Sequence, residues 1–282
     1  MTTVGRVLIL AASVAFQPAS VWARCPDDDT MLTLAEDILL MRPATVPILT
    51  SMDDAYCAQG KLVTLLQAHW GAPVGYKAGL TGRAVQARFG VREPVRGVLL
   101  ADMLLEPGTP VKADFGTRGL FEADLVAVVG SAAINQADTD EEILANLSEW
   151  RPFIELADLM VADPGALSAA QIAAINVGAR KGILGEPIRL DSTTDIIASL
   201  STMRVRVTDQ HGRTLSTAEG SSILGHPLNV VRWLRDSGLT LREGDLLSLG
   251  AFGSFSIPEP GLTATVTYEG LPGTPRISVR FE

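Results

Sequence analysis

Apolar residues recur at three- and four-residue spacing in two segments near the beginning of the chain, 30–45 and 52–71. This spacing is typical of helices that bury one face, so the pattern predicts two amphipathic helices. A loop that contains Pro43 separates them, and Ser51, Asp53 or Asp54 is suited to cap the second helix.

The remaining sequence predicts helices interspersed with short strands. The expected elements are a strand and a glycine-rich turn in 72–80, a helix opening near Thr81, a strand–turn–strand unit in 96–111, a helix over 140–149, an apolar segment at 152–160 and a helix breaking into a loop in 168–185. Alternating runs in 201–220 and 263–282 predict hairpins, and the helix between them has Pro227 in its first turn and Gly238 at its end. No regular strand–helix–strand repeat occurs, so an α+β fold with mostly antiparallel strands is expected.

The chain of 282 residues, with 47% hydrophobic and 20% charged residues, has the composition of an ordinary globular protein and is long enough for one large domain, or for one domain and a small cap. The formal net charge is −9, and no cluster of lysine and arginine is present. Nucleic acid is therefore not an expected partner, because phosphate binding requires such clusters.

The first 23 residues have the pattern of a secretory signal peptide. Arg6 precedes an apolar stretch over 7–16, and the small residues Val21 and Ala23 fit a cleavage site after Ala23. The apolar stretch is too short to span a bilayer, so no membrane anchor is expected after cleavage, and the protein is predicted to be exported, periplasmic or secreted. Cys25 and Cys57 would then enter an oxidising compartment, where a disulfide between them and two free thiols are both open alternatives.

Three acidic residues lie in apolar surroundings. Glu122 and Asp124 alternate in the strand-like segment 119–130 and so share one face of it, and Glu155 lies in the apolar segment 152–160. Buried anions need a compensating charge. One hypothesis is a hard divalent cation such as Mg²⁺ or Mn²⁺; the alternatives are a nearby arginine such as Arg118, or a strand end that reaches water.

Lys77 stands in the turn-like sequence GYKAGLTG. A lysine among glycines can approach a ligand closely and can take part in proton transfer when it is desolvated. The alternative is an ordinary solvated lysine in a turn.

Several segments together resemble one enzyme superfamily. GYKAGLTGRAVQARFGVREPVRGVLLADM, FEADLVAVVG, PFIELAD and the C-terminal GSSILGHPLNVVRWL and GDLLSLGAFGS occur in the order found in the fumarylacetoacetate hydrolase superfamily. They are most similar to its branch of 2-keto-4-pentenoate hydratases and 4-oxalocrotonate decarboxylases. The resemblance implies a mixed β-sheet roll with flanking helices, a catalytic domain over 76–282 and a preceding helical segment over 24–75.

The resemblance also implies site residues. An acidic pair and a later glutamate that bind Mg²⁺ or Mn²⁺ in the family correspond to Glu122, Asp124 and Glu155, with aspartate at 124 where the hydratases usually have glutamate. Further residues implied for the active site are the catalytic Lys77 and Asp102 and the substrate-binding Asn176, Gly250 and Gly253. The chain departs from the family where an Asp-Asn-Ala-Ser segment is replaced by INVG, 175–178, so that only the asparagine is retained.

These observations lead to three functional hypotheses. The first is a metal-dependent hydratase that acts on a 2-hydroxy-2,4-dienoate or 2-oxo-4-enoate such as 2-keto-4-pentenoate. The second is a 2-oxo acid decarboxylase of the 4-oxalocrotonate type, and the third is an exported protein that binds an oxo acid without converting it. Members of the superfamily are usually homo-oligomers, so a homo-oligomer is expected.

Overall fold

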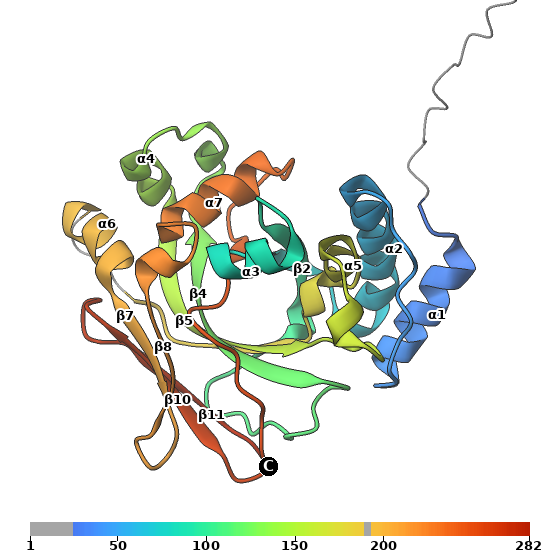
Figure 1. The fold of residues 1–282 in the computed structure, drawn as a ribbon. Coiled ribbons are helices and arrows are strands. Elements are labelled where there is room, and N and C mark those ends of the chain that lie inside the picture. Colours follow the sequence, from blue (N-terminus) through green and yellow to red (C-terminus); the bar gives the residue numbers. More distant parts are fainter. Residues whose placement is uncertain (1–24, 189–192) are drawn as a thin grey trace, which may run out of the picture.

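The computed structural model describes residues 25–188 and 193–282 (Figure 1). The predicted signal peptide, 1–23, lies outside these residues. In the described residues, no helix has the length and apolar character needed to cross a membrane.

The helices follow the amphipathic segments of the sequence. They are α1 (Asp28–Leu39), α2 (Met52–Trp70), α3 (Arg83–Phe89), α4 (Asp140–Ala145), α5 (Ala169–Ala174), α6 (Thr193–Thr202) and α7 (Pro227–Asp236). The Ser51 hydroxyl accepts a hydrogen bond from the backbone N–H of Asp54 at 3.1 Å, which caps α2 as predicted. His226 caps α7 in the same way, ahead of Pro227 in the first turn.

The strands form two sheets. They are β1 (Pro73–Gly79), β2 (Val95–Leu100), β3 (Leu104–Leu105), β4 (Gly119–Val129), β5 (Leu147–Asp158), β6 (Lys181–Leu184), β7 (Arg204–Thr208), β8 (Thr214–Glu219), β9 (Leu246–Ser248), β10 (Thr263–Glu269) and β11 (Arg276–Arg280). The larger sheet has the order β2-β1-β9-β4-β5-β6-β3, in which the β1–β9 and β3–β6 pairs are parallel and the others antiparallel. The smaller sheet, β11-β10-β7-β8, is wholly antiparallel and consists of the two predicted hairpins.

The fold is therefore α+β, with a curled mixed sheet and flanking helices, as expected. One apolar core lies between the two sheets and includes Phe121, Tyr268 and Phe281. A second core joins α1 and α2 to α5, and Figure 1 shows these three helices side by side. Because the first two helices share this core with residues beyond 160, they pack as part of the main body; the predicted division at residue 75 stays a prediction.

One predicted helix is too long. The helix expected over 140–149 ends at Ala145, and β5 begins at Leu147. A capping box between Thr139 and Glu142 starts the helix, but the chain then pairs with β4 from Leu147 onward. Hydrogen bonding along this long strand pair prevails over the local helical pattern.

The two cysteines form a disulfide in the structure. Cys25 and Cys57 are joined with a Cα–Cα distance of 5.5 Å, and no free cysteine occurs in the described chain. The bond attaches the segment before α1 to α2, and it settles the alternative that the sequence left open.

Candidate active site

The acidic residues lie on the two longest strands. In β4 the odd-numbered residues, among them Phe121 and Ala123, face the core between the sheets, so Glu122 and Asp124 point to the opposite face. The register of the antiparallel pair places Glu155 of β5 directly across from Glu122. The fold therefore gathers Glu122, Asp124 and Glu155 on one face of the larger sheet, which we call the acidic face.

Lys77 comes to this face from β1. Its side chain is buried, and its ammonium group donates a hydrogen bond to Oε1 of Glu155 and another, of 3.1 Å, to the carbonyl oxygen of Val177. Gly97 lies opposite Lys77 in β2, where a Cβ would come within 3.0 Å of the lysine side chain. Lys77 is thus a buried ion-pair partner of Glu155 rather than a solvated lysine in a turn.

Asp124 is held by four donors. Its Oδ1 accepts hydrogen bonds from the backbone N–H groups of Leu125, Leu249 and Gly250 at 2.6 to 3.1 Å, and its Oδ2 accepts one from the Ser248 hydroxyl. The side chain is completely buried. These bonds attach the loop after β9 to the acidic face and fix the orientation of the carboxylate.

The carboxylates strongly affect one another. Burial and the neighbouring Glu155 raise the pKa of Glu122 to about 8, and the same two causes raise the pKa of Asp124 to about 7. Lys77 and the Ser248 hydroxyl oppose these shifts without cancelling them. The three acids therefore resist ionising together beside a single lysine.

The donor chemistry of this cluster fits a hard divalent cation. No described residue donates a hydrogen bond to Glu122, and Oδ2 of Asp124 accepts only one, so both can still offer oxygen lone pairs. In the arrangement observed, Glu155 is bound to Lys77, and the described residues include no set of three His, Cys, Asp or Glu side chains arranged to hold an ion. Metal binding by the three acids stays a prediction.

The INVG segment forms an unusual turn beside Lys77. Asn176, Val177 and Gly178 have φ angles of 56°, 55° and 64°, a left-handed conformation that β-branched residues such as valine rarely adopt. The Asn176 amide donates to the Val98 carbonyl at 2.8 Å and accepts from its N–H at 2.7 Å. Both hydrogen bonds of the Asn176 amide thus go to the backbone of β2 and hold the turn in place, and its predicted role in substrate binding stays a prediction.

The other predicted residues are not all brought to the acids. Gly250, with φ of 98°, donates its N–H to Asp124, whereas Gly253 packs against Ser216, whose oxygen would lie 2.4 Å from an added Cβ. Asp102 is exposed beside Gly71 and has no hydrogen bond or ion pair with the acids or Lys77 in the described structure. Its predicted catalytic role remains untested.

The surroundings of Glu155 are closed on the side of β6. A cavity of about 10 Å³ lies there, lined by Phe153, Arg180 and Gly182 among others, and it has room for about one water molecule. Glu122 is the most accessible of the three acids, because it is only partly buried. Solvent therefore reaches the cluster from the Glu122 side.

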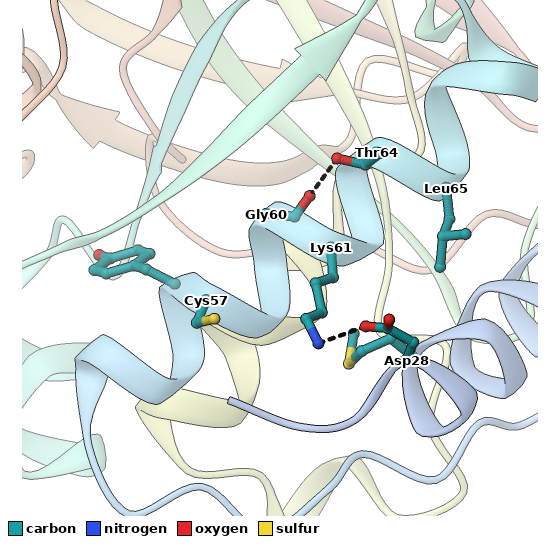
Figure 2. Close-up of a pocket in the computed structure, with 8 residues that line it drawn as sticks. Asp28, Cys57, Gly60, Lys61, Thr64 and Leu65 are labelled. Carbon is teal, nitrogen blue, oxygen red and sulfur yellow. Dashed lines mark hydrogen bonds and ion pairs between the residues drawn. The ribbon is translucent and has the colours of Figure 1, made fainter. Parts of the chain in front are cut away.

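A larger hollow, of about 570 Å³, lies between α1 and α2 (Figure 2). An exposed ion pair of 2.6 Å between Lys61 and Asp28 crosses it beside Cys57. None of the predicted site residues lines it, so it is separate from the acidic face.

Two polar groups near the site were not predicted. Ser248, fully buried at the end of β9, has only its polar character within an apolar run as a signal. Asp158 accepts three backbone N–H bonds of 2.8 to 2.9 Å and lies 3.7 Å from the Arg180 guanidinium, which also reaches the carbonyl of Ile38 in α1. This pair joins the sheet to the N-terminal helices.

Comparison with known proteins places these features in context. No family model matches the chain. The chain is 29% identical over 228 residues to 2-keto-4-pentenoate hydratase 1 of Dechloromonas aromatica (strain RCB), covering 79% of this chain and 84% of that protein. It is 30% identical over 216 residues to 2-keto-4-pentenoate hydratase of Paraburkholderia xenovorans (strain LB400), covering 75% and 78%.

The fold is also similar to a solved structure. A 4-oxalocrotonate decarboxylase from Pseudomonas putida G7, complexed with magnesium and adipate, superimposes with a TM-score of 0.77 at 23% identity. The match covers 92% of this chain and all of that one.

Proposed function

Because the chain belongs to the fumarylacetoacetate hydrolase-like family, in the branch of the 2-keto-4-pentenoate hydratases and 4-oxalocrotonate decarboxylases, we propose that it is a metal-dependent lyase of the hydratase type. The proposed substrate is a 2-hydroxy-2,4-dienoate or its 2-oxo tautomer, such as 2-keto-4-pentenoate. The observation that carries the proposal is the apposition of Glu122 and Glu155, with the buried Lys77 bound to Glu155.

The proposed cofactor is Mg²⁺ or Mn²⁺, held by Glu122, Asp124 and Glu155. The raised pKa values of Glu122 and Asp124 support this, because carboxylates that resist ionisation together are stabilised by an added cation. When bound, the cation supplies positive charge at the C2 oxygen, where negative charge develops as the enolate forms. Asp124, fixed by four hydrogen bonds, would hold its oxygen in place for this purpose.

Lys77 is the proposed proton carrier. Its ammonium group has three donors, of which Glu155 and Val177 take two, so one remains for the substrate. In the proposed reaction the C2 hydroxyl loses a proton and C5 gains one; water then adds its oxygen to C4 and a proton to C3. Lys77 would move the proton between the C2 oxygen and the carbon chain, and burial keeps bulk water from competing.

A decarboxylase is the second candidate, favoured by the extent of the structural match to the Pseudomonas putida G7 protein. Both reactions pass through an enolate, so both would use the same acids and the same lysine. They differ in the bond broken, because decarboxylation releases carbon dioxide.

Export to the periplasm or the medium is part of the proposal. The disulfide between Cys25 and Cys57 supports it, since structural disulfides are rare in proteins of the reducing cytosol. We further propose a homo-oligomer whose small-molecule partner is an oxo acid.

Turnover assays test this function. With Mg²⁺ or Mn²⁺, the protein should consume 2-hydroxypenta-2,4-dienoate, form a hydrated 2-oxo acid without releasing carbon dioxide, and lose activity in EDTA. Glu122→Gln should lower kcat/KM by at least a hundredfold, whereas Glu243→Gln, a control in an exposed loop, should not change it. Carbon dioxide release from 4-oxalocrotonate would favour the decarboxylase, and ligand binding without any product would favour a binding protein.

A further inference from the structure

The segment between β9 and β10 runs antiparallel beside β4. It is attached to that strand by backbone hydrogen bonds from Leu249 to Leu125 at 3.1 Å, from Phe252 to Ala123 at 2.8 Å, and in both directions between Ser256 and Phe121 at 2.9 Å. Its course follows β4 past Glu122. The segment therefore borders β4 from Leu249 to Ser256.

The pairing with Phe121 decides where its side chains point. Ser256 and Phe121 lie directly opposite each other, so they share the face on which Phe121 is buried. The neighbours Phe255 and Ile257 alternate to the other face, which is the face of Glu122. In this register Phe255 lies across from Glu122.

Phe255 and Ile257 are unusually exposed for residues of their size. Their exposed fractions are 54% and 66%. The approach to the acids past β6 has room for about one water molecule. Phe255 and Ile257 therefore flank the partly buried Glu122 on the side of this segment.

The charge of the segment favours an uncharged ligand end. Residues 249–260 contain no lysine or arginine and one acidic residue, Glu259. On the acidic face of the described structure, Lys77 is bound to Glu155 and so is not free to pair with a second carboxylate of a ligand. A second carboxylate at the distal end of a substrate would find no lysine or arginine of this segment as a counter-ion.

We propose that Phe255 and Ile257 form an apolar wall of the substrate site and select 2-oxo acids whose distal end is a hydrocarbon over those that end in a second carboxylate. This inference rests on the proposed function, because it assumes that the oxo-acid end binds at the three acids. Each methylene group that the wall covers strengthens binding by about fourfold.

The test compares two ligands of equal length by titration calorimetry on the full-length mature protein with Mg²⁺. 2-Oxohexanoate ends in a methyl group and 2-oxoadipate in a carboxylate, and we expect the first to bind at least tenfold more tightly. Phe255→Ser and Ile257→Ser should each weaken 2-oxohexanoate binding by about tenfold and leave oxalate binding unchanged. Ile48→Ser removes a side chain that is 91% exposed in the N-terminal segment and should change neither.

The outcomes separate this proposal from the proposed function. If oxalate with Mg²⁺ does not bind, the proposed function fails and the apolar wall fails with it. If oxalate binds but 2-oxoadipate binds as tightly as 2-oxohexanoate, or the two variants bind 2-oxohexanoate normally, only the wall is overturned. A fall in particle mass of the variants by light scattering, with normal 2-oxohexanoate affinity, would assign the two residues to a contact between copies and also overturn it.

Discussion

Replacing Lys77 by methionine tests the role of the buried ion pair. The change keeps most of the apolar stem but removes the positive charge that faces Glu155, and the side chains of the pair are only 4% and 5% exposed. Solvent therefore screens the pair little, and loss of one partner of such a pair costs about 3 to 5 kcal/mol of unfolding free energy.

The loss should depend on pH in a defined direction. Lys77 lowers the pKa values of Glu122 and Asp124, so its removal raises them further above those of the unfolded chain. For acids raised in this way, the stability is fully present below the unfolded pKa, about 4, and is lost as pH rises through the folded pKa. The variant should therefore be strongly destabilised at pH 8 and only mildly at pH 5.

Urea unfolding of the two proteins at pH 5 and pH 8, without divalent metal, measures this difference. Lys61→Met is the matched control, because its pair with Asp28 is exposed and contributes at most about 1 kcal/mol. Equal destabilisation of Lys77→Met at both pH values would refute the reasoning, since it would show that loss of packing and not of charge is responsible.

Two further predictions concern the disulfide and the pH dependence of the unmodified protein. Replacing both Cys25 and Cys57 by serine should lower the unfolding free energy by about 4 kcal/mol, because the unfolded chain is no longer constrained by a loop with a sequence separation of 32. Urea unfolding measures the loss, and an unchanged midpoint would contradict it. In the unmodified protein without metal, the raised pKa values of Glu122 and Asp124 should make stability fall as pH rises from 5 to 8. Saturating Mg²⁺ should make this fall smaller in thermal unfolding, and an unaltered pH dependence would contradict metal binding at these acids.

Local patterns predicted most elements of this fold. The amphipathic spacing of 30–45 and 52–71 gave both N-terminal helices, and the alternation around Glu122 gave a strand with its acids on one face. The helix over 140–149 was predicted too long, because its last residues belong to a strand that is determined by pairing with β4.

The site depends on contacts between distant parts of the chain, and these have weak local signals. Lys77 meets Glu155 across 78 positions, and Asp124 meets Ser248 across 124, so neither pairing could be read from spacing. The left-handed turn at Val177 contradicts the preference of a β-branched residue, and only the contacts around it explain that conformation. Periodicity did not indicate that the acids and Lys77 share one site. The resemblance to the fumarylacetoacetate hydrolase superfamily implied it.

Thermal unfolding of the mature protein with metal and oxalate tests the central claim most directly. Oxalate has the two oxygens of an oxo-acid enolate, and a ligand at about a hundred times its Kd should stabilise the native state by roughly 2.7 kcal/mol. We predict that oxalate raises Tm only when Mg²⁺ or Mn²⁺ is present and that Glu122→Gln abolishes the effect. If metal and oxalate, separately or together, leave Tm unchanged in the unmodified protein, the three acids do not form an oxo-acid site.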